Sequence, residues 1–154
     1  MPASPPIDDI HGGLIRALRA FRSLVGSLPS EVPGVGRVTP DQFALLAHLR
    51  DRAPATMGEV AAARSIAINT ATAIVDRLVA QGWVERRADP QDRRLVMVTL
   101  TAPGQQFVAD LLELRQRRLR SLLEHLSGAE LDALSAATPV IDKLAELARL
   151  EAWV

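Results

Sequence analysis

The chain has 154 residues with 18 cationic and 18 anionic side chains, so its formal net charge at pH 7 is zero. This length is typical of one domain, and an apolar content of 48% with few aromatics favours a globular, largely helical fold. A neutral chain is unlike proteins that coat nucleic acid over their whole surface, although a local basic patch stays open. The absence of cysteine excludes disulfides, zinc–thiolate sites and thiol redox sensing.

Several other classes of protein find no support in the sequence. No run of about 18 apolar residues predicts a membrane span. The acidic N-terminus has no signal-peptide pattern, so we expect a cytoplasmic protein. The three histidines lack the spacing of metal ligands, and no metal or other cofactor is predicted. Neither a glycine-rich phosphate loop nor a nucleophile–base set occurs, so an enzyme is not expected.

A long helix is predicted from Ile7 to Leu28, because apolar residues recur there at steps of three or four. Its apolar stripe consists of Ile7, Ile10, Leu14, Leu18, Phe21, Val25 and Leu28. The proline- and glycine-rich segment that starts at Pro29 ends this helix and predicts a loop.

Two shorter helices are predicted next from the signals at their N-termini. Thr39, followed by a proline, is typical of a helix start, and that helix runs to about residue 52. Thr56 and Glu59 have the spacing of a capping box, which predicts a short helix over 57–63.

A fourth helix is predicted over 68–81, with Gly82 as its C-terminal cap. After this glycine, the pattern changes from helical to extended. Residues 83–87 and 95–100 read as two strands, and the turn residues of 88–93 join them into a hairpin.

Two further helices are predicted over 103–125 and 128–150, the first capped by Thr101 and the second by the pair Ser127 and Glu130. The predicted fold class is therefore mainly α with a small β-hairpin wing (α+β), a winged helix-turn-helix.

The predicted organisation is a single domain over 1–154 with two functional regions. A winged helix-turn-helix lobe for DNA binding covers 39–101, and a helical dimerisation region covers 7–28 and 103–150. Because the first helix lacks a partner nearby in sequence, a second subunit is expected to cover its apolar stripe. The expected interface residues are Ile7, Ile10, Leu14, Leu18, Phe21, Leu131, Leu134, Ile141 and Leu144.

The helix over 68–81 is the expected recognition helix, since the second helix of such a unit enters the major groove of DNA. Its outer face offers Asn69, Thr70, Thr72, Ala73 and Arg77. Asparagine and threonine can bond base edges, whereas a phosphate is the expected partner of the arginine. An ordinary helix start with solvated hydroxyls is the alternative interpretation.

The hairpin brings arginines together around one turn. Arg86 and Arg87 end one strand, while Arg93 and Arg94 begin the next. Such a tip can insert an arginine into the narrow minor groove, with Asp92 orienting Arg94. A solvated, salt-bridged turn is the alternative.

The run from Asp92 to Gly104 resembles the wing signature of the MarR family, D-x-R-x-x-x-V-x-L-T-x-x-G, with every fixed position matched in order. Residues 71–86 are similar to the recognition helix and first wing strand of that family. Two positions depart from the pattern. Ala73 stands where the family often has a basic residue, and Arg64 replaces an apolar residue, which predicts a phosphate contact at the turn between the helices.

The resemblance implies a homodimeric transcriptional regulator, most often a repressor, that binds a pseudo-palindromic operator on double-stranded DNA. It also implies release by a small aromatic or phenolic ligand, bound between the dimerisation helices and the winged lobe. His11, Arg16 and His48 are the candidates for that pocket, with ordinary interface or surface roles as the alternative. A winged-helix protein-interaction module that has lost specific DNA binding is the alternative function.

Overall fold

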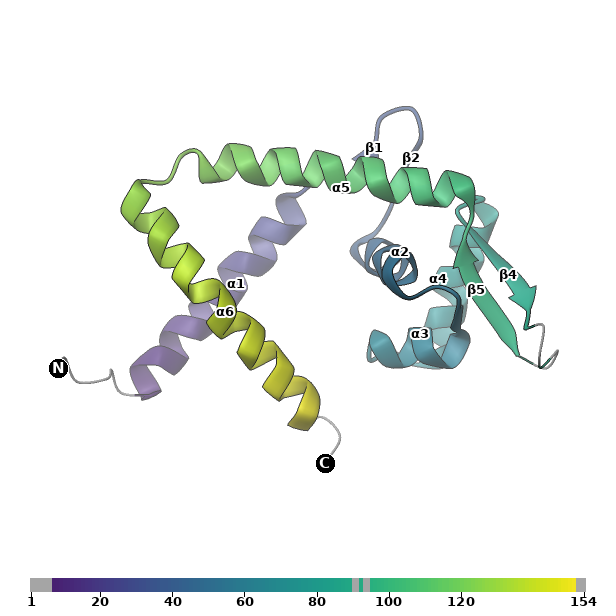
Figure 1. The fold of residues 1–154 in the computed structure, drawn as a ribbon, viewed down its shortest axis with the longest axis horizontal. Helices are drawn as coiled ribbons and strands as arrows, with labels where there is room; N and C mark the ends of the chain where they lie inside the picture. Colours follow the sequence, from purple (N-terminus) through teal and green to yellow (C-terminus); the bar gives the residue numbers. More distant parts are fainter. Residues whose placement is uncertain (1–6, 90–91, 93–94, 152–154) are drawn as a thin grey trace. The chain divides into compact units, whose positions relative to one another are not determined.

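The computed structural model describes residues 7–89, 92 and 95–151 (Figure 1). The chain divides into two compact units, Met1–Arg115 and Gln116–Val154. In chain order, the elements are helix α1 (Ile7–Ser27), strands β1 (Glu31–Val32) and β2 (Gly36–Arg37), helix α2 (Pro40–Arg52), strand β3 (Ala55–Thr56), helices α3 (Met57–Ala63) and α4 (Ile68–Ala80), strands β4 (Val84–Ala88) and β5 (Val96–Leu100), and helices α5 (Ala102–Leu123) and α6 (Gly128–Glu151). The predicted fold class, mainly α with a small β-hairpin, is confirmed.

Capping boxes begin both helices that follow the first loop. The backbone N–H of Gln42 donates to Thr39 Oγ1 at 3.2 Å, and the N–H of Thr39 donates to Gln42 Oε1 at 2.8 Å. At α3, the N–H of Thr56 donates to Glu59 Oε2 at 2.7 Å, as the sequence predicts. Hydrogen bonds from the backbone N–H and the hydroxyl of Thr56 lower the pKa of the Glu59 carboxyl group.

The strands differ from the sequence prediction in two respects. The segment after α1, expected to be a loop, contains the antiparallel pair β1–β2, closed by an ion pair between Arg37 and Glu31. Strand β3 was also not predicted. It pairs with β5, so that the wing is a three-stranded sheet in the order β3-β5-β4. Both β1 and β3 span two residues, too few for a period-two pattern to be visible in the sequence.

Trp83 was expected in the first wing strand but lies before it. Gly82 has a φ of +74°, which ends α4 in the left-handed conformation that glycine adopts without strain. The Trp83 ring is buried and stacks on Phe107 of α5, with the ring centroids 3.9 Å apart. The backbone N–H of Thr101 donates to the Trp83 carbonyl at 3.0 Å. The tryptophan therefore joins the end of α4, the wing and α5.

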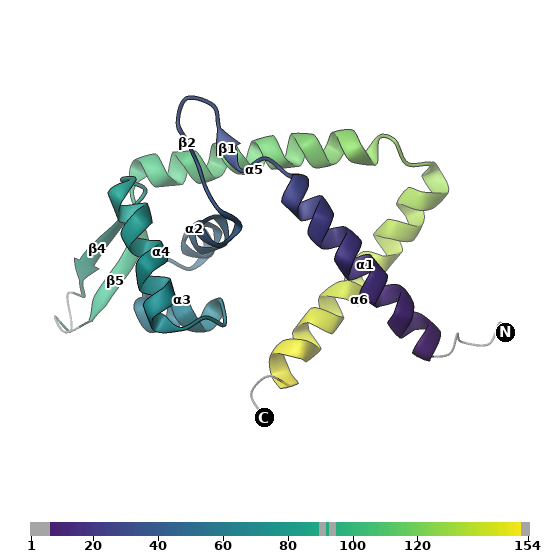
Figure 2. The ribbon, with the colours of Figure 1, turned by 180° about the vertical axis from the view of Figure 1, so that it is seen from behind.

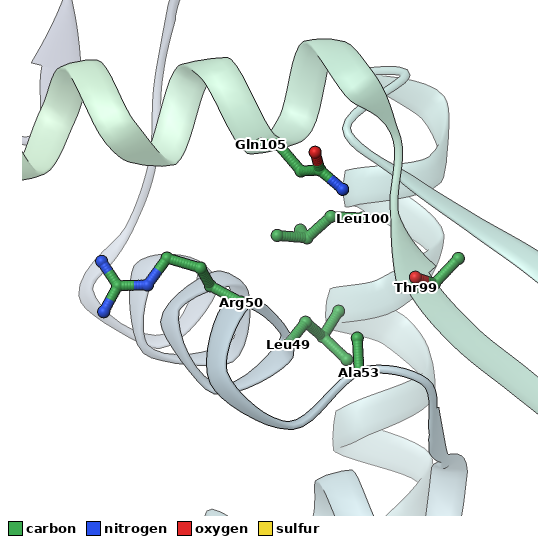
Figure 3. Close-up of a pocket in the computed structure, with 6 residues that line it drawn as sticks. All are labelled: Leu49, Arg50, Ala53, Thr99, Leu100 and Gln105. Atoms are coloured by element: carbon green, nitrogen blue, oxygen red, sulfur yellow. The ribbon is translucent and has the colours of Figure 1, made fainter.

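One hydrophobic core holds α2, α3, α4, the wing and the first half of α5 together. Its fully buried side chains include Leu45, Leu46, Leu49, Val60, Val75, Leu78, Val98, Phe107 and Leu111. Figure 3 shows Leu49 from α2 and Leu100 from β5 at the junction where these elements meet α5. Burying a side chain of this size stabilises the fold by about 1.5–3 kcal/mol, so the helices and the wing behave as one lobe.

The apolar stripes of α1 and α6 lie outside this core. Large apolar side chains are exposed on both helices, namely Ile7, Ile10, Leu18 and Phe21 on α1, and Leu131, Leu134, Ile141 and Leu144 on α6. In the described part of the chain, no helix has the length and apolar character needed to cross a membrane.

Candidate nucleic-acid interface

Helices α3 and α4 form a helix-turn-helix. The turn begins at Arg64, the C-cap of α3, and Ser65 follows with a φ of +50°. The N–H of Ile66 donates to the carbonyl of Ala61 at 3.1 Å, which holds the turn against the first helix. This tight connection leaves one face of α4 packed on α3 and α2 and the other face in solvent.

The two faces of α4 are clearly separated. Its buried residues are Ala71, Ile74, Val75 and Leu78, at the spacing of a helix that packs along one side. The candidate DNA-contacting residues Asn69, Thr70, Ala73 and Arg77 are all exposed. Their side chains are therefore accessible from solvent.

Thr72 differs from these four residues. It is half-buried, and its hydroxyl donates a hydrogen bond to the carbonyl of Ile68 at 2.9 Å. Because the one hydroxyl proton is engaged within the helix, Thr72 can only accept a hydrogen bond from a base.

An ion pair joins the wing to α4. Arg86 Nη1 of β4 donates to Asp76 Oδ1 of α4 at 2.6 Å. Figure 2 shows these two elements beside one another, as their contacts also indicate. Arg87 pairs with Glu85 of its own strand at 2.5 Å. Arg86 and Arg87, the two wing arginines that the structure describes, therefore both have carboxylate partners.

The tip of the wing is described only in part. Arg93 and Arg94, and with them the expected pairing of Arg94 with Asp92, lie outside the described residues. Within the turn, the N–H of Asp92 donates to Asp89 Oδ1 at 3.0 Å.

Arg64 points toward α2. One of its guanidinium nitrogens lies 3.9 Å from Asp41 Oδ1, and its side chain is about two-thirds buried, with 35% exposed. Arg64 also lines a hollow of about 700 Å³ between the end of α1, the start of α2 and α5. The hollow is lined by Arg22, Leu28, Phe43, Ala47, Arg64 and Arg115, among others.

Arg115 forms one wall of this hollow. Its guanidinium lies 3.6 Å from the centre of the Phe43 ring, and its Nε donates to the Pro29 carbonyl at 2.8 Å. Burial lowers the pKa of Arg115. A partly desolvated guanidinium that stacks on an aromatic ring, with two more arginines in the lining, suits a planar anion.

The sequence candidates for a ligand pocket do not line this hollow. His11 and Arg16 lie on α1, whereas His48 lines a separate hollow of about 330 Å³ with Glu59. Sequence reasoning missed Phe43 and Arg115 as pocket residues because 72 positions separate them along the chain.

Figure 3 shows a third hollow, of about 440 Å³, where α2, β5 and α5 meet. Its lining mixes apolar residues, among them Leu49 and Leu100, with polar ones such as Arg50, which donates to Asp51 at 2.9 Å.

A helix-turn-helix followed by an antiparallel wing on a shared core defines a winged helix-turn-helix protein. Residues 38–96 match the model of the MarR family. The crystal structure of wild-type apo MarR from Escherichia coli is 31% identical, covers 68% of this chain and 78% of that chain, and has a TM-score of 0.61. The chain belongs to the MarR family and is a transcriptional regulator.

Two further comparisons bear on the regulator. The transcriptional repressor MprA of Escherichia coli K12 is 35% identical over 80 residues, which are 52% of this chain. The match covers 46% of MprA, about half of its length. The structure of BpsR from Bordetella bronchiseptica is 27% identical, covers 91% of this chain and 98% of that one, and has a TM-score of 0.62. BpsR is described as regulated in its DNA binding by 6-hydroxynicotinic acid.

Proposed function

We propose that this regulator binds a pseudo-palindromic operator as a homodimer, represses transcription and is released by a small aromatic or phenolic anion. The exposed face of α4 carries the DNA-binding part of the proposal, because it presents Asn69 and Thr70 to the major groove while the core fixes the helix. Arg93 and Arg94 at the wing are proposed to reach the adjacent minor groove. Arg64 and Arg77 are proposed to contact phosphates.

The apolar stripes of α1 and α6 support the homodimer. Phe21 is 62% exposed and Ile141 is 54% exposed, and each belongs to a row of exposed apolar side chains. Contiguous apolar surface of this kind marks an interaction site. A second copy offers the same rows in return, as a two-fold interface requires.

The hollow beside Arg115 supports release by an anion. Its lining combines the Phe43 ring with three guanidinium groups, from Arg22, Arg64 and Arg115. Arg64 also begins the turn that leads into α4. A ligand that binds Arg64 would therefore act on the segment that positions the recognition helix. The description of BpsR and the name of MprA agree with ligand response and repression, respectively.

A footprint on the DNA around the gene tests the proposal, with and without a panel of aromatic acids. We expect protection of two half-sites about one DNA turn apart, steep salt dependence and loss of protection with an effective acid. Arg93→Ala and Arg94→Ala should each weaken binding, and an unchanged footprint in both variants would remove the wing from the proposal. Arg22→Ala should blunt release by the acid, whereas Arg19→Ala, one turn earlier on α1, is the matched control.

A protein-interaction module that has lost specific DNA binding is the second candidate. The net charge of zero and the exposed Ala73 favour it. A mobility shift at low salt separates the two candidates, since only the regulator retards the DNA upstream of its own gene.

A further inference from the structure

The centre of the exposed face of α4 carries a methyl group where a polar side chain would read a base. Ala73 is exposed, and it lies four residues after Asn69 and four before Arg77. Residues four apart lie above one another on a helix, so these three side chains form one row along the outer face.

Between Thr70 and Arg77, no other residue of α4 offers a free side-chain hydrogen-bond donor beside Ala73. Thr72 donates its hydroxyl proton to the carbonyl of Ile68. Asp76 has only acceptor oxygens when ionised, and Arg86 engages one of them at 2.6 Å. Between Thr70 and Arg77, a stretch that is fully described, the outer face of α4 is therefore apolar or acceptor-only.

The edge of each base pair in the major groove has a distinct chemistry. All four bases present hydrogen-bonding groups there, and thymine alone adds an apolar one, its C5-methyl group. An alanine Cβ is short enough to let the helix approach closely and apolar enough to displace water from that methyl group.

We propose that Ala73 is a specificity-determining residue that reads the C5-methyl group of one thymine in each half-site. This inference rests on the proposed operator binding. Burying a group of this size against another apolar group predicts about a fourfold gain in affinity for each thymine. Two half-sites in a symmetric dimer then give about fifteenfold.

The test begins with selection of binding sites from a random duplex library by the full-length protein. Each thymine of the selected half-site is then replaced by deoxyuridine, which removes only the methyl group. The affinity ratio between the thymine and uracil probes is measured for three proteins, namely the unmodified chain, Ala73→Gly and Ala80→Gly. Ala80 is the matched control because it is exposed on the same helix two turns further on.

We expect one thymine per half-site whose replacement weakens the unmodified protein about fourfold. Ala73→Gly should bind the thymine and uracil probes equally, and Ala80→Gly should keep the fourfold ratio. Ala73→Ser, whose hydroxyl favours water over a methyl group, is a second variant with better helix propensity than glycine, and its ratio should also move toward one.

Two results overturn the inference. If a binding sequence is selected but the ratio of affinities for the thymine and uracil probes is the same in Ala73→Gly as in the unmodified protein, only the proposed role of Ala73 is wrong. If no sequence is enriched from the library, the proposed specific binding of an operator is wrong as well. The two outcomes therefore separate the two proposals.

Discussion

Arg86 of the wing strand β4 donates to the carboxylate of Asp76 on α4, with 2.6 Å between Nη1 and Oδ1. The pair joins the wing to the recognition helix on the surface that we propose faces DNA. It also neutralises the carboxylate of Asp76, which would otherwise repel phosphates. Arg86, expected from the sequence to contact DNA, is thus held by the protein itself.

Removing the arginine should weaken operator binding mainly through the carboxylate that is left behind. We expect Arg86→Ala to bind roughly tenfold more weakly, because an unpaired like charge then faces the phosphates. Adding Asp76→Asn to that variant should restore most of the affinity. Fluorescence anisotropy with labelled operator measures all three proteins. A double variant no better than Arg86→Ala would show that Arg86 contacts phosphate directly.

Gly104 allows α5 to approach the segment between α4 and the wing. A Cβ atom at this position would lie 1.9 Å from the backbone oxygen of Trp83. We expect Gly104→Ala to lower the free energy of unfolding by about 2–3 kcal/mol, since backbone must move. Gly128→Ala is the control, because nothing lies within 4 Å of its Cβ. In urea denaturation, the free energy of unfolding of Gly128→Ala should stay within about 1 kcal/mol of that of the parent. Equal effects would contradict the close packing.

A charge placed in the exposed apolar row of α1 should disrupt the homodimer. We expect Phe21→Glu to sediment as a monomer with unchanged helix content, because a carboxylate at an apolar interface is costly to desolvate. Val35→Glu is the matched control, since Val35 is 57% exposed in the turn between β1 and β2. A dimer that persists in Phe21→Glu would exclude this row from the interface.

The capping box at α3 should make stability depend on acid pH. Hydrogen bonds from Thr56 lower the pKa of Glu59 below its ordinary value of 4.5. Since the folded-state pKa is the lower one, the carboxylate stabilises the fold above the ordinary value. That contribution is lost as the pH falls through the lowered pKa.

Glu59→Gln tests this dependence, because glutamine can still cap the helix but does not titrate. Below pH 4.5, its free energy of unfolding should decline less steeply than that of the parent. Urea denaturation across the acid range measures both curves, and parallel curves would contradict the assignment.

Much of the helix-turn-helix could be predicted because its signals are local. The caps at Thr39 and Thr56, the helix-ending Gly82 and the buried face of α4 each depend on residues within one or two turns of one another. Strand β3 and the pair β1–β2 could not, since two-residue strands are defined by their partners and not by their own pattern.

The candidate site divides in the same way. The outer face of α4 follows from helical periodicity, so the exposure of Asn69, Thr70 and Arg77 was predictable. The hollow beside Arg115 was not predictable, because stacking of Arg115 on Phe43 depends on how α5 packs beside α2.

The sequence by itself determined the helices, the wing hairpin and the apolar row of α1, because helical and extended periods depend on neighbouring residues. Only the tertiary structure decided which charged groups meet. Asp76 and Arg86 lie on different elements, as do Arg64 and Asp41. Such pairs form where packing of the core brings two surfaces within a few ångströms, and no spacing along the chain encodes that distance.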